Sequence, residues 1–263
     1  MQSLDAMTPD IARKIRAVFT DIDDTLTTGG KLPGDAYQAL WRLHDAGIAV
    51  VPVTGRPAGW CDLIARQWPV EGVVGENGAL AYYEQDGRLI RLYHPDVAGD
   101  DAQERLRAVK EAVLQEVPHS RVAKDQFARL YDLAIDFSEE PPHLDLGVAD
   151  QIAEVFRRMG ARAKVSSIHV NGWFGDYDKL SMTRLFTRER WGLDLDEHRE
   201  EFLFCGDSLN DEPMFAWFPY ACGVANVHDF KDAMTSLPKF VTSGRGGEGF
   251  CQLADRLLEL RAD

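Results

Sequence analysis

The 263-residue sequence lacks a long apolar segment. No run approaches the roughly 20 apolar residues that a membrane-spanning helix needs. Residues 1–16 mix acids and bases where a secretory signal would have a continuous apolar core. Apolar residues make up 45% of the chain, an ordinary value for a globular protein. We therefore expect a cytoplasmic protein with no membrane partner.

Positive charge is scarce as well. The chain has 29 lysine and arginine residues against 43 aspartate and glutamate residues, which gives a formal net charge of -14. Nucleic-acid binding requires clustered Lys and Arg to neutralise phosphates, and the sequence contains no such cluster. We therefore expect no nucleic-acid partner. A small anionic ligand remains compatible with this charge if particular basic residues or a metal supply local positive charge.

Cysteines are few and widely spaced. Cys61, Cys205, Cys222 and Cys251 form no C-x-x-C pair and show no spacing typical of a zinc site. We interpret them as buried apolar residues, with a catalytic thiol as the less favoured alternative for any one of them.

Apolar strands alternate with helical segments in the first and last thirds of the sequence. The segment 48–53 is nearly all apolar, which is typical of a strand covered on both faces. This alternation predicts an α/β fold with a doubly wound parallel sheet. The expected strands are 17–20, 48–53, 72–74, 202–205, 220–224 and 240–241, and the expected helices are 35–46, 58–68, 179–191, 210–218 and 251–260.

The middle of the sequence has a different pattern. Residues 101–117 form an amphipathic helical pattern, and apolar residues at 133, 135 and 137 alternate with other residues, as in a half-exposed strand. A helix at 149–159 and a strand at 163–170 follow. One-sided strands suit an antiparallel sheet. We therefore expect an α+β module at 95–172, inserted into a core formed by 1–94 and 173–263.

Polar residues follow three of the expected core strands. Asp21-Ile22-Asp23-Asp24-Thr25 follows the first strand, Thr54-Gly55-Arg56 follows the second, and Gly206-Asp207-Ser208-Leu209-Asn210-Asp211 follows the strand at 202–205. In open α/β sheets the ligand crevice lies outside the carboxyl ends of the strands. We therefore expect these three segments to converge on one site.

Convergence would crowd the carboxylates of Asp21, Asp23, Asp207 and Asp211 into one pocket. At about 4 Å each like-charge pair costs about 4 kcal/mol at an effective dielectric of about 20, so the cluster requires a cation. Hard oxygen ligands in a partly open site suit Mg²⁺, and Lys179 can add a fixed positive charge. The residues thus predict metal-assisted phosphoryl chemistry with a carboxylate available as nucleophile.

The ordered set of Asp21-x-Asp23-x-Thr25, Thr54, Lys179 and Gly206-Asp207-x-x-Asn210-Asp211 resembles the four motifs of the haloacid dehalogenase superfamily. An insert between the second and third motifs is similar to the type IIB cap of its Cof-like, sucrose-phosphatase-like and mannosyl-3-phosphoglycerate-phosphatase-like members. The resemblance implies a Rossmann-like core with an inserted type IIB cap, and it covers nearly the whole chain.

Two further features bear on this resemblance. The stretch Glu76-Asn77-Gly78-Ala79 is similar to an Asn-Gly-Ala segment usual in that branch. Asp24 departs from the pattern, because many relatives have glycine there. The departure adds an acid beside the site and alters no position to which a role is assigned.

The resemblance implies roles for the first two acids. Asp21 corresponds to the nucleophile that attacks phosphorus and forms an aspartyl-phosphate. Asp23 corresponds to the general acid/base that protonates the leaving alcohol and then activates the hydrolytic water. Mg²⁺ would be held by the Asp21 carboxylate, the Asp23 backbone carbonyl and Asp207, with Asp211 as a further ligand or as an orienting residue.

A second group of residues is expected to bind the substrate. Thr54 and Lys179 would bind the transferring phosphoryl oxygens, with help from Asn210. Gly55 and Arg56 belong to the same candidate set, although a surface salt bridge is an equally favoured interpretation of Arg56.

The inserted module offers weaker candidates. His169, Asn171 and Trp173 lie where the module returns to the core and could face the substrate, but we favour simple packing for Trp173. Lys124 and Arg129 could meet a distal anionic group, and a solvated face is the safer interpretation of both.

These observations predict a Mg²⁺-dependent phosphatase that acts on a small phosphorylated metabolite, with a sugar phosphate favoured. A sugar phosphomutase is the nearest alternative, because relatives with the same cap type move phosphoryl groups with the same nucleophile. A catalytically silent metabolite-binding module is the second alternative, against which the intact set of motif residues argues. The sequence indicates no oligomeric state.

Overall fold

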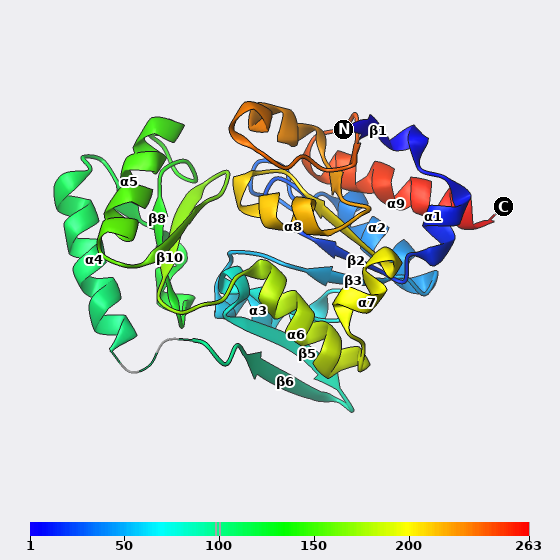
Figure 1. Cartoon of the computed structure of the whole chain (residues 1–263), viewed down its shortest axis with the longest axis horizontal. Coiled ribbons are helices and arrows are strands. Elements are labelled where there is room, and N and C mark those ends of the chain that lie inside the picture. Colours follow the sequence, from blue (N-terminus) through cyan, green and yellow to red (C-terminus); the bar gives the residue numbers. More distant parts are fainter. Residues whose placement is uncertain (98, 100, 263) are drawn as a thin grey trace.

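In a computed structural model that describes residues 1–97, 99 and 101–262, the described chain forms three β-sheets flanked by helices (Figure 1). The largest sheet has the order β1-β13-β12-β11-β2-β3, and all its neighbouring strands are parallel. Its strands are β1 (Gln2–Ser3), β2 (Ala17–Thr20), β3 (Ala49–Pro52), β11 (Phe202–Gly206), β12 (Cys222–Gly223) and β13 (Phe240–Val241). The predicted doubly wound parallel sheet is confirmed.

Helices cover both faces of this sheet. Val18 of β2 belongs to an apolar cluster with one set of helices, and its neighbour Phe19 belongs to a cluster with the other set, as expected for a strand without a solvated side. The first set is α1 (Pro9–Lys14), α2 (Gly34–Asp45), α3 (Ala58–Gln67) and α9 (Gly246–Ala262). The second set is α6 (Lys179–Trp191), α7 (Leu195–His198) and α8 (Glu212–Trp217).

A three-stranded sheet extends the core beyond β3. It consists of β4 (Val73–Gly75), β5 (Leu80–Gln85) and β6 (Arg88–Tyr93), and a parallel bridge between Val53 and Val74 joins it to the main sheet. The hairpin β5–β6 was not predicted. Its turn residues Asp86 and Gly87 both have positive φ, and Asp-Gly is a strong signal for this type of turn.

The inserted segment has its own antiparallel sheet with two helices packed on it (Figure 1). Its strands, in sheet order, are β7 (Arg121–Val122), β8 (Asp132–Asp136), β10 (His169–Trp173) and β9 (Arg162–Val165), and its helices are α4 (Ala102–Glu116) and α5 (Leu146–Arg158). The single strand predicted at 163–170 is wrong. This stretch is the hairpin β9–β10, in which Val165 pairs with Val170.

The alternation predicted for β8 is present, but the expectation of a half-exposed strand is wrong. Leu133 and Ile135 pack with α4 and α5, while Asp132 and Asp136 alternate with them, and all five residues of the strand are buried. The core covers the second face, where Asn77 Nδ2 donates a hydrogen bond to Asp132 at 3.3 Å. The polar side of β8 is therefore a contact between core and insert rather than a solvated face.

Two connections join the insert to the core, and a bridge between Val97 and Gly175 holds them together. The boundaries predicted at 95 and 172 stay a prediction. None of the described helices combines the length and the apolar character needed to cross a bilayer.

Candidate active site

The structure brings the three polar segments together at the carboxyl end of the main sheet. Asp21 follows β2, which lies between β3 and β11, and its N–H donates to the carbonyl of Cys205 at 2.9 Å. On the other side the N–H of Val53 donates to the carbonyl of Thr20 at 2.7 Å. Thr54 and Asp207 thus follow the two neighbouring strands, and the parallel register places them beside Asp21.

Three carboxylates form a compact buried cluster at this position. One oxygen each of Asp21, Asp207 and Asp211 lies within 4.8 Å of the others. Lys179 Nζ donates to Asp21 Oδ1 at 2.6 Å and to Asp211 Oδ1 at 2.7 Å. One ammonium group therefore faces a larger number of buried acids.

The pKa values of the cluster reflect this imbalance. Burial, with further contributions from Asp211 and Asp23, raises the pKa of Asp21 to about 8 despite the opposing charge of Lys179. Burial and the neighbouring Asp211 likewise raise the pKa of Asp207 well above its ordinary value. Burial acts to lower the pKa of Lys179, but Asp21 and Asp211 outweigh it and hold that pKa above its usual range. Without a cation, the carboxyl groups of Asp21 and Asp207 therefore tend to keep their protons.

Asp207 shows where a cation fits. Its Oδ1 accepts a hydrogen bond from Thr25 Oγ1 at 3.2 Å, whereas its buried Oδ2 has no hydrogen-bond partner among the described residues. A buried carboxylate oxygen without a partner is costly. Hard carboxylate oxygens are the donors that Mg²⁺ prefers, so the residues present fit this metal.

Two glycines allow the backbone to approach closely enough to build the cluster. A Cβ on Gly206 would lie 2.4 Å from Asp211 Oδ2, which accepts the N–H groups of Asp207 and Ser208. Gly78 has φ +106, and a Cβ there would lie 2.0 Å from the carbonyl oxygen of Asp178. Asp178 caps α6 immediately before Lys179. The Asn-Gly-Ala segment found in the sequence therefore helps to position Lys179.

Asp23 lies beside the cluster and is held by Arg56. The Arg56 guanidinium donates to both oxygens of Asp23 at 2.8 to 3.1 Å, and it also contacts Asp125 at 3.2 Å and Glu139 at 2.8 Å. Arg56 is only 3% exposed, so the surface salt bridge considered from the sequence is wrong. It forms a buried link from the core to the insert.

The other candidate substrate-binding residues make local contacts. Thr54 Oγ1 accepts the N–H of Arg56 at 3.0 Å and keeps its own hydroxyl proton for donation. The carbonyl of Gly55 accepts a hydrogen bond from Arg129 Nη1 at 2.7 Å. Asn210 Oδ1 accepts from Ser208 Oγ at 3.0 Å. Among the described residues, the Thr54 hydroxyl and the Asn210 Nδ2 amide thus each have a donor left for a ligand.

Asp24, the departure from the motif, has φ +58. This left-handed backbone region favours glycine, and aspartate and asparagine tolerate it better than most residues. The N–H of Asp24 donates to Thr27 Oγ1 at 3.0 Å, and the Thr27 hydroxyl donates to the carbonyl of Ile22 at 3.2 Å. These bonds hold the loop in its shape.

Sequence reasoning missed a buried polar network between core and insert. The side chain of Arg129 is fully buried, and it pairs with Asp125 at 3.1 Å and with Asp132 at 2.9 Å. The solvated interpretation is therefore wrong for Arg129. It is right for Lys124, whose side chain is 78% exposed and lies 3.5 Å from Glu140.

Glu76 is the second missed residue. Its fully buried carboxylate accepts the N–H groups of Ala58 at the start of α3 and of Leu130, Tyr131 and Asp132 in the insert. Burial, followed by the charge of Asp132, raises the pKa of Glu76 to about 7. Its partners in the insert are 54 or more positions away, so no local sequence signal marks this role.

The three candidates at the return from the insert differ in their contacts. His169 Nε2 lies 2.9 Å from Glu139 Oε2, and Asn171 Nδ2 donates to Asp132 at 2.8 Å. Trp173 stacks on Tyr177 with ring centroids 5.6 Å apart. Packing is thus the observed role of Trp173, as favoured from the sequence.

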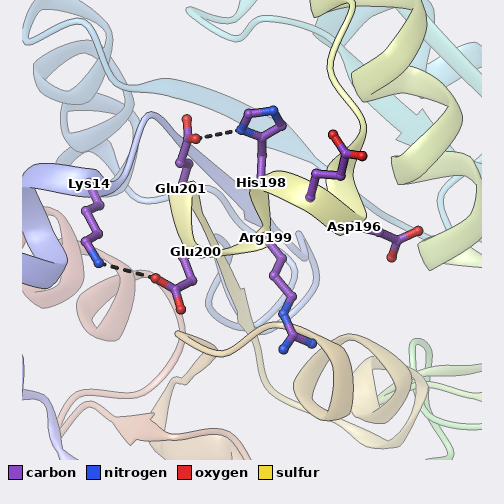
Figure 2. Close-up of a pocket in the computed structure, with 7 residues that line it drawn as sticks. Lys14, Asp196, His198, Arg199, Glu200 and Glu201 are labelled. Atoms are coloured by element: carbon purple, nitrogen blue, oxygen red, sulfur yellow. Dashed lines mark hydrogen bonds and ion pairs between the residues drawn. The ribbon is translucent and has the colours of Figure 1, made fainter.

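A separate surface pocket of about 540 Å³ is lined by Lys14 and residues 196–201 (Figure 2). In it His198 Nδ1 and Glu201 Oε1 lie 2.7 Å apart. These residues precede β11, so the pocket lies at the amino end of that strand, whereas Asp207 follows its carboxyl end. It contains none of the predicted site residues, and we assign it no part in the reaction.

The arrangement of motif residues agrees with the comparison to known families. Residues 18–117 match the family model of haloacid dehalogenase-like hydrolases. The chain is similar to this family over these residues. Two related proteins are named as phosphoglycolate phosphatases. The one from Saccharolobus solfataricus is 22% identical over 255 residues, which are 93% of this chain and 96% of that protein. The one from Pyrobaculum aerophilum is 35% identical over 89 residues, 33% of this chain and 38% of that protein.

Solved structures share the whole fold of this chain. A Thermoplasma acidophilum protein has a TM-score of 0.70 at 20% identity, covering 94% of this chain and 99% of its own. A Plasmodium vivax protein described as a putative HAD/COF-like hydrolase has a TM-score of 0.69 at 17% identity, covering 96% and 100%. The sucrose-phosphatase of Synechocystis has a TM-score of 0.61 at 15% identity, covering 92% and 97%. The family match supports the predicted superfamily, the solved structures share the predicted fold of a core with an inserted module, and the prediction of an enzyme of the phosphatase class is confirmed.

Proposed function

We propose that this phosphatase is Mg²⁺-dependent and hydrolyses a small phosphorylated metabolite through an aspartyl-phosphate on Asp21. The observation that carries the proposal is the position of Asp21. It follows β2 at the carboxyl end of the sheet, is clustered with Asp207 and Asp211, and is held by Lys179. A carboxylate fixed beside an ammonium group and a cation site is arranged to attack a phosphate ester.

The chemistry proceeds in two steps. An Asp21 oxygen attacks phosphorus, the bond from phosphorus to the ester oxygen breaks, and Asp23 gives its proton to the departing alcohol. Asp23, now a carboxylate, takes a proton from water. The resulting hydroxide attacks the phosphorus of the aspartyl-phosphate, which releases inorganic phosphate and restores the Asp21 carboxylate.

The acid cluster would hold Mg²⁺ through the carboxylates of Asp21, Asp207 and Asp211 and the backbone carbonyl of Asp23. The unpartnered Oδ2 of Asp207 supports this assignment. When bound, the cation would neutralise the repulsion between the attacking carboxylate and the phosphate dianion. Lys179 adds a second positive charge at the same place, because its ammonium group already contacts Asp21.

The remaining motif residues would orient the phosphate and the general acid. Thr54 would donate its free hydroxyl proton to a phosphoryl oxygen, with Gly55 and Asn210 shaping the same surface. Arg56 holds both oxygens of Asp23, so it fixes the direction of the carboxylate. Because both oxygens of Asp23 accept hydrogen bonds from Arg56, one of them must be released before Asp23 can donate a proton to the leaving oxygen.

A sugar phosphate is the substrate that we favour. A cavity of about 380 Å³ lies next to Asp23, within the range of small-molecule sites, and residues of both core and insert line it. The inserted module would cover the aspartyl-phosphate from bulk water and contact the leaving group, while the chemistry stays in the core. A cytoplasmic location and the module boundaries at 95 and 172 remain predictions.

The direct test replaces Asp21 by Asn, which keeps the size of the side chain and removes the attacking oxygen anion. Phosphate release from a panel of phosphorylated metabolites and from p-nitrophenyl phosphate should fall by about three orders of magnitude or more. Asp86→Asn, in the exposed β5–β6 turn, is the matched control and should leave turnover unchanged. Retained turnover in Asp21→Asn with unaltered circular dichroism would refute the nucleophile.

The same assay separates hydrolysis from phosphoryl transfer between sugar positions. A phosphatase releases inorganic phosphate from a single sugar phosphate without any bisphosphate activator. A product isomer without free phosphate would instead indicate a phosphomutase.

A further inference from the structure

The cavity beside Asp23 is where the leaving group of the substrate must lie. A general acid has to reach the departing oxygen directly, and Asp23 lines this cavity. The core contributes the loop after β2 and Arg56, and the insert contributes Ser138, Glu139 and Ser167. The group attached to the phosphate therefore meets residues of both modules.

The charges around this cavity are unbalanced. Three carboxylates line it, those of Asp23, Asp24 and Glu139, against the guanidinium of Arg56 and the imidazole of His143, whose Nδ1 lies 2.9 Å from the carbonyl oxygen of Ser138. Arg56 is already shared between Asp23, Glu139 and Asp125. The Arg56 guanidinium is thus fully engaged with protein acids and is not available to an anionic leaving group.

Asp24 differs from the other two carboxylates of the cavity. Asp23 and Glu139 both pair with Arg56, and Glu139 also contacts His169 at 2.9 Å. In the part of the chain that the structure describes, Asp24 has no ion-pair partner within 4.0 Å. Its loop is held by backbone and Thr27 contacts instead. The Asp24 carboxylate is therefore a negative charge at the wall of the cavity that no direct ion pair neutralises, since the nearby Arg245 guanidinium pairs with Asp229 instead.

We infer that Asp24 is a specificity-determining residue that excludes leaving groups carrying a carboxylate or a second phosphate, and that the enzyme takes phosphomonoesters of neutral polyols or of amino alcohols. This inference rests on the proposed function of the same site. A leaving-group hydroxyl or ammonium can donate a hydrogen bond to Asp24, with Ser138 and Ser167 as further partners. A carboxylate would instead meet uncompensated like charge.

The test uses three phosphomonoesters of nearly equal size whose leaving groups differ in charge. They are 2-phosphoglycolate with a carboxylate, 2-hydroxyethyl phosphate with a hydroxyl, and phosphoethanolamine with an ammonium. For the wild-type enzyme we expect kcat/KM to be at least about tenfold lower for 2-phosphoglycolate than for the other two. Asp24→Asn should narrow this gap about tenfold, because Asn keeps the shape and the left-handed backbone while removing the charge.

Asp86→Asn is the matched control, since Asp86 is an exposed aspartate that also has positive φ, at 50°. It should leave the ratio of kcat/KM values unchanged. Equal or preferred turnover of 2-phosphoglycolate by the wild type would overturn the inference. So would a ratio that Asp24→Asn does not alter.

A binding measurement keeps this inference separate from the proposed function. If the wild type releases no phosphate even from p-nitrophenyl phosphate, the proposed function fails, and calorimetric binding of the three esters then tests the cavity alone. Suppose that the wild type binds 2-phosphoglycolate more weakly than the other two esters and that Asp24→Asn binds it as tightly as they are bound. This result would support the selection by charge without catalysis. Equal binding of the three esters, or no binding of any, would overturn it.

Discussion

The protein contains two buried regions rich in acids, and they are constructed in opposite ways. In the cluster of Asp21, Asp207 and Asp211, one lysine faces three carboxylates and Asp207 Oδ2 has no partner among the described residues. The second region is the seam between core and insert. Its acids Asp23, Asp125, Asp132 and Glu139 pair with Arg56 or Arg129, and Glu76 accepts backbone N–H groups. The first region leaves charge for a ligand to neutralise, and the second uses charge to hold two modules together.

The pKa values of Asp21 and Glu139 express the same difference, whereas burial and Asp132 raise the pKa of Glu76 in the seam to about 7. Burial and like charge raise the pKa of Asp21 to about 8, so the cluster tends to keep protons until a cation replaces them. In the seam, His169 and Arg56 lower the pKa of Glu139 to about 2, against the effect of its burial. Glu139 is therefore ionised at neutral pH, and its negative charge is already paired with Arg56. An excess of buried acids indicates a ligand site only where their charge is not satisfied internally.

The largest expected effect is at the centre of the seam. Replacing Arg129 by Met would leave Asp125 and Asp132 buried without their partner, which costs about 3–5 kcal/mol of unfolding free energy. Chemical denaturation measures this loss. Arg158→Met, which removes an exposed ion pair with Glu116, is the control and should change stability by no more than about 0.5 kcal/mol. Similar small losses in both variants would show that the seam is not a stabilising network.

The second prediction concerns the cation site. Replacing Asp207 by Asn should lower phosphate release by at least about 100-fold, since even residues that only support metal ligands contribute about 10–100-fold. Mg²⁺ at a hundredfold excess over its dissociation constant should stabilise the wild type by about 2.7 kcal/mol.

That stabilisation should be absent in Asp207→Asn, whereas stability without Mg²⁺ should be unchanged or higher, because one repelling charge is gone. Thermal denaturation with and without Mg²⁺ measures both quantities. An undiminished Mg²⁺ shift in the variant would mean that Asp207 is not a ligand.

The third prediction addresses Arg56, which joins the two regions through Asp23 on one side and Asp125 and Glu139 on the other. Arg56→Lys keeps the charge but cannot hold three carboxylates with one planar fork. We expect kcat to fall about tenfold for alkyl phosphates, because Asp23 loses its orientation. The loss should be smaller for p-nitrophenyl phosphate, whose leaving group needs less protonation. Equal losses on both substrates would argue against a role through Asp23.

The fourth prediction is a fall in the melting temperature of the metal-free protein as the pH rises. The folded-state pKa of Asp21, about 8, exceeds its ordinary value of 3.8, and that of Glu76, about 7, exceeds 4.5. The folded protein therefore binds more protons than the unfolded chain between these values. Its stability should fall as the pH rises from about 4 towards 8.

Saturating Mg²⁺ should flatten or reverse this slope, because the metal binds the deprotonated carboxylates and displaces their protons. Melting curves from pH 5 to 8 in chelator and in Mg²⁺ measure the two slopes. A melting temperature that rises with pH in chelator would contradict the assignment of these protons.

The core and its motif residues could be predicted from sequence because their signals are local. Asp21 and Asp207 each directly follow an apolar strand, and parallel strands align their carboxyl ends, so these two acids had to meet. The seam has no such signal. The contact of Arg129 with Gly55 and those of Glu76 with residues 130–132 form only when the two modules dock, although the acid partners of Arg129 lie within the insert.

Two predictions within the insert were wrong. That of a half-exposed β8 failed because no local signal marks a docked face, and that of a single strand at 163–170 failed for a simpler reason. For β8 the alternation correctly marked Leu133 as inward, but a period of two cannot tell whether the other face meets water or another module. The stretch predicted as one strand contains the pair Ser166-Ser167, which is a turn signal. The prediction of a single strand did not take this signal into account.

The order of strands in the main sheet also determines when each module can form during synthesis. The strands of the insert pair only with one another, within residues 121–173. By contrast, β2 pairs with β11, and β1 at the start of the chain pairs with β13 near its end. At roughly 5–20 residues per second, a ribosome needs about 10–40 s to proceed from β2 to β11. The apolar residues of β2 therefore stay unpaired on that side while the insert is completed, and during this interval they are exposed to aggregation.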